Sequence, residues 1–366
     1  MKQAVYHGIE DVRIQDVDVP TPGPGEVVVK NRVTLTCGTD IKMFMRGYRY
    51  DPPHLIGHEA AGVVVEVGDG VNTVKEGDHV IFSFRPNCGH CRYCSGGRSV
   101  LCVGHNDSPR YVMHDGTARL KLNGEPVNQM ARIGTFSEYV VCPSEQLVPI
   151  RKDLPWTHAA IIGCSVATGV GSVIRHAKVQ AGSTVLVIGC GGVGLNVVQG
   201  ARLAGAGKII GVDLKDNKLE YAREFGATHT INATTSNDVI GEIRALTSDG
   251  LGVDYAFDAI GSERTALQIV DALAPGGHAV FIGMPPVKEV APINPFQMVF
   301  YEKKLTGAYY GSVHPPTDLP ILADLAMSGR LTLDPLISRT YKFDEINEGF
   351  KQLVEGNVAR GVVVFD

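Results

Sequence analysis

The sequence predicts an α/β protein with two domains, one rich in β-strands and one built on a doubly wound parallel sheet. Residues 1 to about 165 contain short, Val-rich segments bounded by Gly, Pro or Asp, which is typical of strands. Residues 166–309 alternate between apolar strands and helices, which indicates a parallel sheet with helices on both faces. The length of 366 residues agrees with two domains of about 100–200 residues each.

The individual elements follow from the same patterns, taken in chain order. The β-rich part has strand-like segments at 25–35, 60–68, 78–84 and 136–143. The alternating part gives strands at 183–189, 209–213, 252–260 and 276–284, with helices at 193–206 and 216–227. Residues 310–366 hold helical segments near 319–329 and 343–356 and a closing strand at 361–366. We expect them to pack back on the first region, which makes the domains 1–165 with 310–366, and 166–309.

Composition narrows the class of function. The net charge of −5 gives no broad positive field, so nucleic acid and anionic membranes are poor partners. No run of some 18 apolar residues and no signal peptide is apparent, which favours a cytoplasmic location. Eight cysteines in such a chain indicate metal binding or free thiols rather than disulfides.

A glycine-rich loop lies between a predicted strand and a predicted helix. It comprises Gly189, Gly191, Gly192, Val193 and Gly194. Glycines in this position permit a tight turn and a close approach of backbone to pyrophosphate, which the helix N-terminus then attracts.

Asp213 ends the next strand, about 20 residues after the loop, where a carboxylate bonds the ribose hydroxyls and repels a 2′-phosphate. The pattern therefore favours NAD over NADP. Asp213 could also be a helix N-cap. Lys218 could reach the ribose or be a solvated helix lysine.

Four cysteines, Cys88, Cys91, Cys94 and Cys102, follow the spacing C-x2-C-x2-C-x7-C. Four thiolates in one short stretch suit tetrahedral structural zinc. Free thiols or a redox pair are the alternative, and a nucleic-acid-binding zinc ribbon is a further one that the net charge disfavours.

A second set of metal-type residues flanks this stretch: Cys37, His58 and Cys164, with Glu59 adjacent to the histidine. Two thiolates and an imidazole supply the three protein ligands of a catalytic zinc, which keeps one position open. Each of these residues could singly be an ordinary buried side chain, and Cys164 in particular.

At these residues the chain resembles the zinc-dependent medium-chain alcohol dehydrogenase family. The zinc signature G-H-E-x2-G-x5-G-x2-V is met by Gly57, His58, Glu59, Gly62, Gly68 and Val71. The four-cysteine lobe, the loop GCGGVG and the closing motif FDEINEGF match as well, so the resemblance covers nearly the whole chain. It implies a GroES-like β-rich catalytic domain, with the structural zinc lobe at 88–102, interrupted by a Rossmann NAD-binding domain.

The resemblance also implies roles for single residues. Cys37, His58 and Cys164 are expected to bind the catalytic zinc, with Glu59 as a nearby or transient ligand. Asp40 is expected to bond the His58 imidazole and fix its tautomer. Thr39 is expected to pass the substrate proton outward, although it could be a plain turn residue.

Further roles concern the cofactor and the substrate. Arg360 is expected to contact cofactor phosphate, or to form a surface salt bridge. Phe84 and Phe136 are expected to line the substrate pocket together with Tyr48, although both phenylalanines could be core residues.

Two positions depart from the pattern of many family members. Lys42 stands where they carry a histidine that accepts the proton, and a lysine with its ordinary pKa of about 10.4 is a poor acceptor. Proton release through the cofactor ribose and water, or through a Lys42 with a lowered pKa, is then expected. Gly38 stands where others hold a cation or histidine for the pyrophosphate.

The expected activity is zinc-dependent, NAD-linked oxidation of an alcohol to an aldehyde or ketone by reversible hydride transfer, with two zinc ions per chain. An apolar pocket favours a medium-sized aliphatic or aromatic alcohol. A polyol or amino-alcohol dehydrogenase, hinted at by the run CGTD, is an alternative, as is a dehydrogenase of glutathione adducts. A non-catalytic relative is the alternative of another class. A homodimer or homotetramer paired through the sheet edge near 276–286 is also expected.

Overall fold

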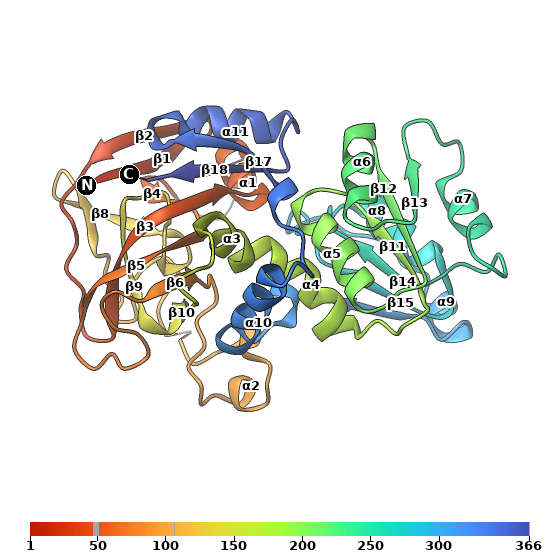
Figure 1. The fold of residues 1–366 in the computed structure, drawn as a ribbon, viewed down its shortest axis with the longest axis horizontal. Helices are drawn as coiled ribbons and strands as arrows, with labels where there is room; N and C mark the ends of the chain where they lie inside the picture. The colour runs from red at the N-terminus through yellow and green to blue at the C-terminus, as the bar shows by residue number, and fades with distance from the viewer. Residues whose placement is uncertain (47–50, 106, 366) are drawn as a thin grey trace. The chain divides into compact units, whose positions relative to one another are not determined.

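The computed structural model describes residues 1–46, 51–105 and 107–365 (Figure 1). It divides into two compact units, Met1–Cys164 with His314–Asp366 (unit 1) and Ser165–Val313 (unit 2). The sequence placed the two junctions at 165 and 310. Unit 1 is rich in strands and unit 2 holds one parallel sheet, so the predicted α/β class is confirmed.

Unit 1 contains a seven-stranded sheet centred on the long strand β3. The order is β10 (Leu147–Pro149), β6 (His79–Phe82), β5 (Glu59–Val67), β3 (Glu26–Thr36), β18 (Arg360–Val364) and β17 (Ile337–Lys342), and β9 (Tyr139–Pro143) also pairs with β3. β3 runs antiparallel to β5, β9 and β18. Its valines pack with those of β5 and β6 in one apolar cluster. This packing fixes β3 and β5, the two strands next to which candidate metal ligands lie.

A second sheet of unit 1 has five strands. Its order is β2 (Asp11–Asp16), β1 (Lys2–Gly8), β4 (His54–Leu55), β8 (Glu125–Gln129) and β7 (Leu120–Leu122). Helix α11 (Ile346–Val354), which the sequence predicted within 343–356, buries Phe350 against Phe136 and Phe44 in the neighbouring core.

One helix of unit 1 departs from the expected run of strands. Helix α1 spans Gly38–Arg46, directly after β3. Its apolar residues Ile41, Phe44 and Met45 recur at helical spacing and contact the same core as Phe350. The acidic side chain of Asp40 lies in the first turn, where the positive end of the helix dipole favours it. The remaining helices of unit 1 are α2 (Arg92–Ser95), α3 (Trp156–Ile161) and α10 (Pro315–Met327).

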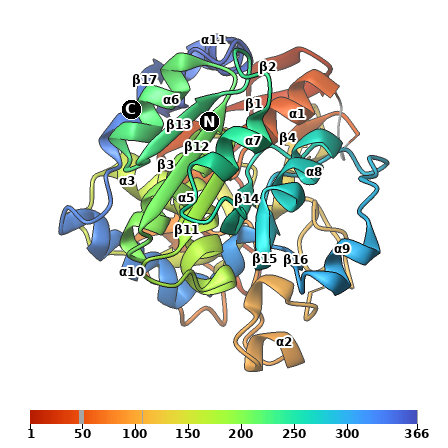
Figure 2. The same ribbon diagram turned by 90° about the vertical axis from the view of Figure 1, so that its right-hand side faces the viewer.

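Unit 2 is a six-stranded parallel sheet (Figure 2). Its order is β13 (His229–Asn232), β12 (Lys208–Asp213), β11 (Thr184–Ile188), β14 (Val253–Asp258), β15 (Leu273–Phe281) and β16 (Lys304–Gly307). Its helices are α4 (Ala167–Gly171), α5 (Gly192–Leu203), α6 (Asp216–Glu224), α7 (Val239–Ala245), α8 (Glu263–Asp271) and α9 (Pro295–Phe300). β12 and β14 flank β11 on opposite sides, so the strand order reverses at β11, which is where open α/β sheets bind ligands.

The segment 276–286 does not form the edge of this sheet as expected. It contributes to β15, which pairs on both sides, with β14 and with β16. Among the described strands the edge is therefore β16, one strand further out. The sequence missed this strand because Lys304–Gly307 is short and polar at its start.

One helical run, Trp156–Ala177, is long and apolar enough to cross a membrane by length and composition. The sequence did not indicate this long helix, because Thr, Ser, Gly and His residues interrupt its apolar residues. Of its most apolar stretch, 83% is buried inside the structure. Because most of this stretch packs against other parts of the fold, the run is accounted for as a core helix.

His54 makes the stability of unit 1 depend on pH. Its side chain is 1% exposed, and this burial lowers its pKa from an ordinary value of 6.5 to about 4. The folded state therefore binds fewer protons than the unfolded state between these values. The stabilisation is complete above about pH 6.5 and is lost as the pH falls towards 4.

Between about pH 7.5 and pH 5, we expect the unfolding free energy of the wild type to fall by about 2 kcal/mol more than that of His54→Phe. Phenylalanine keeps a ring against Tyr111 and cannot titrate. Denaturant unfolding at both pH values measures the change, and a constant difference contradicts the assignment.

Candidate metal centres and active site

The four cysteines of the 88–102 lobe lie together. Their sulfur atoms are all within 4.8 Å of one another, and Cys88–Cys94 and Cys91–Cys102 are each 4.0 Å apart. All four are free thiols, not disulfides. Tetrahedral zinc with Zn–S bonds of about 2.3 Å requires sulfur separations of about 3.8 Å. The set therefore fits structural zinc.

The backbone around the lobe favours thiolates. The amide N–H groups of Cys88 and Cys91 donate to the sulfurs of Cys102 and Cys88 at 3.4 and 3.3 Å. Backbone donors lower the pKa of Cys91 to about 5. The buried Arg85 guanidinium donates to the carbonyls of Val100 and Cys102 and so holds the C-terminal end of the lobe in place. Burial has the opposite effect on Cys94 and Cys102 and raises the pKa of both thiols. Metal binding at the lobe therefore requires that these two thiols lose their protons.

The second predicted set also lies together, within unit 1. One ligand atom from each of Cys37, His58, Glu59 and Cys164 is within 4.8 Å of the others, and all four side chains are buried. Cys164 Sγ is 3.5 Å from His58 Nε2. A tetrahedral zinc with bonds of about 2.3 Å to sulfur and 2.0–2.1 Å to nitrogen requires about 3.6 Å. The donor set and its spacing therefore fit a catalytic zinc.

Strand pairing brings these residues together. Leu35 of β3 pairs with Glu59 of β5, so the residues just beyond β3 and just before β5, Cys37 and His58, meet at one end of the sheet. Gly57 has a φ of +100°, and a Cβ there would lie 2.7 Å from Thr135 Oγ1 and 2.8 Å from the Phe136 amide nitrogen. The glycine of the G-H-E motif is thus required by sterics.

Cys164 comes from a local irregularity that the sequence did not indicate. It lies in a short π-helical segment, Ile162–Val166, within the long helical run. Such segments turn side chains out of regular helical register and occur often at functional sites. A hydrogen bond from Cys164 holds the pKa of Cys37 well below its usual value, although burial opposes this.

Asp40 orients the histidine. Its Oδ1 is 3.2 Å from His58 Nδ1, and its Oδ2 accepts the Cys37 N–H at 3.0 Å, all in a fully buried setting. Burial alone would lower the pKa of His58, but the negative charges of Asp40 and Cys37 outweigh it and raise that pKa. With Nδ1–H donating to Asp40, the Nε2 lone pair points to the metal set.

Replacing Asp40 by asparagine tests this orientation. The amide keeps an acceptor oxygen but removes the charge that holds the imidazole. We expect the affinity for the zinc ion at this set to fall about 10- to 100-fold, the usual effect of losing an outer partner of a metal ligand. Competition with a chelator measures it, and the lobe zinc serves as an internal control because Asp40 does not contact it.

Arg360 lies in the metal set. Its guanidinium is 4% exposed, 3.4 Å from Glu59 Oε1 and 3.9 Å from Cys37 Sγ. Burial raises the pKa of Glu59 to about 8, although the charge of Arg360 opposes it. Neither Glu59 oxygen accepts a hydrogen bond among the described residues, and the ion pair with Arg360 is the contact of its carboxylate that the structure shows. The expected contact of Arg360 with cofactor phosphate stays a prediction.

The proton-relay candidates lie on α1. Thr39 and Lys42 are both half-buried and three positions apart, hence on one face of the helix. Of the pocket candidates, the Phe84 ring meets the His58 ring edge-on with centroids 5.6 Å apart. Phe136 is fully buried in a core against Phe350, which gives it a packing role; that it lines a pocket stays a prediction. Tyr48 lies outside the described residues.

The glycine-rich loop follows β11 and opens α5, as predicted. Gly189 has a φ of +94°, which favours glycine. A Cβ on Gly194 would lie 1.7 Å from the Gly189 carbonyl oxygen, so the turn itself requires glycine there. A Cβ on Gly191 would meet nothing within 4 Å. This open space at a helix N-terminus fits the approach of a pyrophosphate.

Asp213 at the end of β12 is tied to the loop. Its Oδ2 accepts the Cys190 N–H at 2.8 Å, and its Oδ1 accepts the Leu214 and Lys215 N–H groups at 2.7 and 3.2 Å. It is not the N-cap of α6, because Lys215 holds that position. Lys218 is 8% exposed, so it is a buried lysine and not a solvated one. The ribose contacts of both remain predictions.

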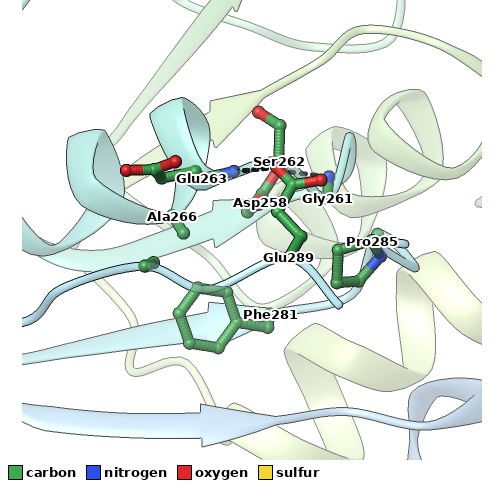
Figure 3. A pocket seen from close by; sticks show the side chains of 10 residues that line it. Asp258, Gly261, Ser262, Glu263, Ala266, Phe281, Pro285 and Glu289 are labelled. Atoms are coloured by element: carbon green, nitrogen blue, oxygen red, sulfur yellow. Dashed lines mark hydrogen bonds between the residues drawn. The ribbon is translucent and has the colours of Figure 1, made fainter. Parts of the chain in front are cut away.

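A small pocket that the sequence did not indicate lies in unit 2, where β14 and β15 end (Figure 3). Its volume is about 160 Å³. Asp258, 1% exposed, accepts the N–H groups of Ile260 and Gly261. Glu289 accepts the N–H of Glu263 (Figure 3). Three acidic residues, Asp258, Glu263 and Glu289, line this pocket, which does not suit a phosphate.

Comparison with known proteins agrees with this geometry. The alcohol dehydrogenase GroES-like domain matches residues 23–152, and the zinc-binding dehydrogenase domain matches residues 192–328. An S-(hydroxymethyl)glutathione dehydrogenase of Paracoccus denitrificans is 39% identical over 97% of this chain and 96% of its own. A class-3 alcohol dehydrogenase of Cereibacter sphaeroides is 38% identical over the same shares.

Two solved structures are similar throughout. An alcohol dehydrogenase zinc-binding domain protein from Burkholderia ambifaria has a TM-score of 0.94 and 31% identity, covering 100% of this chain and 98% of its own. Benzyl alcohol dehydrogenase from Acinetobacter calcoaceticus has a TM-score of 0.92 and 29% identity, covering 100% and 99%. Zinc fits both metal sets, and zinc and NAD are the cofactors of this family. The chain belongs to the zinc-dependent medium-chain alcohol dehydrogenase family.

Proposed function

We propose that the protein oxidises an alcohol reversibly to an aldehyde or ketone at the Cys37–His58–Cys164 set, with NAD as hydride acceptor. The buried grouping of two thiols and one imidazole, with a charged pair beside it, carries this proposal. Zinc held there supplies a Lewis acid that lowers the pKa of an alcohol, and the nicotinamide accepts the hydride. The residues around it bind, orient and move the proton.

Thr39 is proposed to accept the alcohol proton and pass it outward. It stands on α1 between the exposed Gly38 and the buried Asp40 and is itself half-buried. Lys42, on the same helix face, is proposed to accept the proton from Thr39 only if its own pKa is lowered. Otherwise the proton leaves through water and the cofactor ribose.

Glu59 and Arg360 are proposed to balance charge as the reaction proceeds. The carboxyl with its raised pKa can hold a proton or pair with the guanidinium, and it lies within 4.8 Å of the ligand atoms. Asp213 is proposed to select NAD, since its carboxylate repels a 2′-phosphate.

The substrate is proposed to be a medium-sized aliphatic or aromatic alcohol. The Phe84 ring beside His58 offers an apolar wall, and the similar structure from Acinetobacter is a benzyl alcohol dehydrogenase. S-(hydroxymethyl)glutathione is the second candidate, because the Paracoccus relative at 39% identity is named for it.

A panel of primary, secondary, aromatic and polyol alcohols and S-(hydroxymethyl)glutathione, assayed with NAD and NADP, tests these proposals. The expected result is NAD-linked turnover that is highest with an aliphatic or aromatic alcohol. Preference for the glutathione adduct supports the second candidate. Turnover of none of them, with two zinc ions per chain, contradicts the proposed substrate class.

We also propose a homodimer or homotetramer that pairs through the β16 edge and the segment before it. Val287, Val290 and Val299 are 81%, 73% and 80% exposed, and Phe296 and Phe300 are 64% and 66% exposed. So much exposed apolar surface in one segment marks an interaction site. Sedimentation of the wild type and of Val299→Asp tests this, and a monomeric wild type contradicts it.

For the location of the protein in the cell, we propose the cytoplasm.

A further inference from the structure

A third cluster of metal-type side chains lies outside both zinc sets. His105, His114 and Glu145 each offer one ligand atom, and these atoms lie within 4.8 Å of one another. Both imidazole Nε2 atoms face the same carboxylate oxygen, Glu145 Oε1, at 3.2 Å from His105 and 2.5 Å from His114. The two rings stack with centroids 4.0 Å apart and an angle of 24° between their planes.

One nitrogen of this cluster lacks a hydrogen bond. His114 Nε2 hydrogen-bonds to Glu145, but His105 Nε2 is a buried atom with no such partner among the described residues. Burial lowers the pKa of His105, while the bond from His114 holds the pKa of Glu145 down against the opposing effect of burial. A neutral imidazole facing a carboxylate is the protonation state in which both groups bind metal.

The cluster is held in place by a buried cation that does not belong to it. Arg132 is 1% exposed and donates to the backbone carbonyls of His105 and Val112, at 3.2 and 2.8 Å. The same guanidinium also donates to the Ser108 carbonyl at 3.0 Å. These bonds hold the backbone close to both histidines, and an ion bound by the cluster would replace the direct hydrogen bond between His114 and Glu145.

Glu145 is fixed from another part of unit 1. It lies in the 3₁₀ turn Ser144–Gln146, between β9 and β10. The neighbouring Gln146 side chain donates to the carbonyls of Ser83 and Ala131 at 3.0 and 2.9 Å. The fold therefore places the Glu145 carboxylate next to the two histidines.

We propose that His105, His114 and Glu145 form a third metal site, which binds Zn²⁺ or a similar divalent transition metal ion. Two imidazoles and one carboxylate suit such ions and not Mg²⁺ or Ca²⁺, which prefer oxygen ligands. Three protein ligands leave a position open to solvent. The side chains are 21%, 34% and 21% exposed, so an ion there exchanges with solution more readily than an ion in the fully buried set of Cys37, His58 and Cys164.

Calorimetric titration of the enzyme, already loaded with two zinc ions, tests the site with Zn²⁺ as the probe. We expect one further equivalent to bind to the wild type. Loss of a ligand in His114→Asn, or of charge in Glu145→Gln, should weaken this binding at least about tenfold, the lower limit found for lesser changes around metal ligands. Mg²⁺ should give no such binding.

His229→Gln is the matched control, since this histidine lies in unit 2 and contacts Thr228, away from the cluster. It should bind the third equivalent as the wild type does. Each variant must first show two zinc ions and a wild-type unfolding temperature, which separates a lost site from a misfolded protein. Absence of a third equivalent in the wild type, or equal affinity in His114→Asn and Glu145→Gln, overturns the proposal.

Discussion

Replacing Cys37 by serine is expected to remove one of the two zinc ions and to lower kcat/KM at least about a thousandfold. A serine hydroxyl cannot provide the thiolate that this buried set requires. Lewis-acid stabilisation is worth several kcal/mol, and about 4 kcal/mol corresponds to a factor of a thousand. Zinc content by mass spectrometry and steady-state kinetics on the preferred alcohol measure both effects.

Two further variants make the result specific. Cys142→Ala removes a buried free cysteine of β9 that belongs to no metal set, and it should keep both zinc ions and its activity. Cys102→Ser should lose the lobe zinc instead. Full activity in Cys37→Ser after one zinc has been lost means that the catalytic assignment is wrong.

Replacing Gly191 by alanine is expected to raise the Kd for NAD about 10- to 100-fold without changing the unfolding temperature. Gly191 has a φ of −84°, which alanine adopts readily, and its Cβ would project into open space. That space is where the cofactor backbone contact is expected, so the methyl group interferes only with the ligand. Forcing a methyl group into an occupied space costs about 1–3 kcal/mol, which is the stated range in affinity.

Gly194→Ala provides the contrast, because its Cβ would clash with the Gly189 carbonyl in the free protein. It should lower both the unfolding temperature and NAD affinity. Gly307→Ala is the matched control, in the same unit with nothing within 4 Å of its Cβ. Fluorescence titration with NADH and thermal unfolding measure these effects. Unchanged NADH affinity in Gly191→Ala contradicts the placement of the cofactor.

What the sequence predicts well is what is local. The cysteines of the lobe lie within 15 residues, and the strand, loop and helix around Gly189 are continuous, so spacing alone indicates their geometry. The alternation in unit 2 also indicates its parallel sheet. The catalytic set was assigned through family resemblance, because spacing does not show that Cys164 and His58, which are 106 positions apart, are neighbours.

The features that the sequence missed depend on long-range packing. Arg360 and Cys37 are 323 positions apart, and only the pairing of β18 with β3 brings the guanidinium to Glu59. His114 and Glu145 have no recognisable spacing, and a buried arginine holds the loop that leads to His114. Helix α1 was missed although Ile41, Phe44 and Met45 have helical spacing, because the segment is only nine residues long and follows a long predicted strand.

The pairing of β18 with β3 also sets an order of events during synthesis. Residues 360–364 emerge from the ribosome only after all of unit 2 has been made. Unit 2 has its whole chain available by residue 313, whereas the large sheet of unit 1 still lacks two adjacent strands at that point. Since domains fold as units during translation, the inserted unit can fold first. The nascent chain therefore completes the surroundings of Cys37 and Glu59 last.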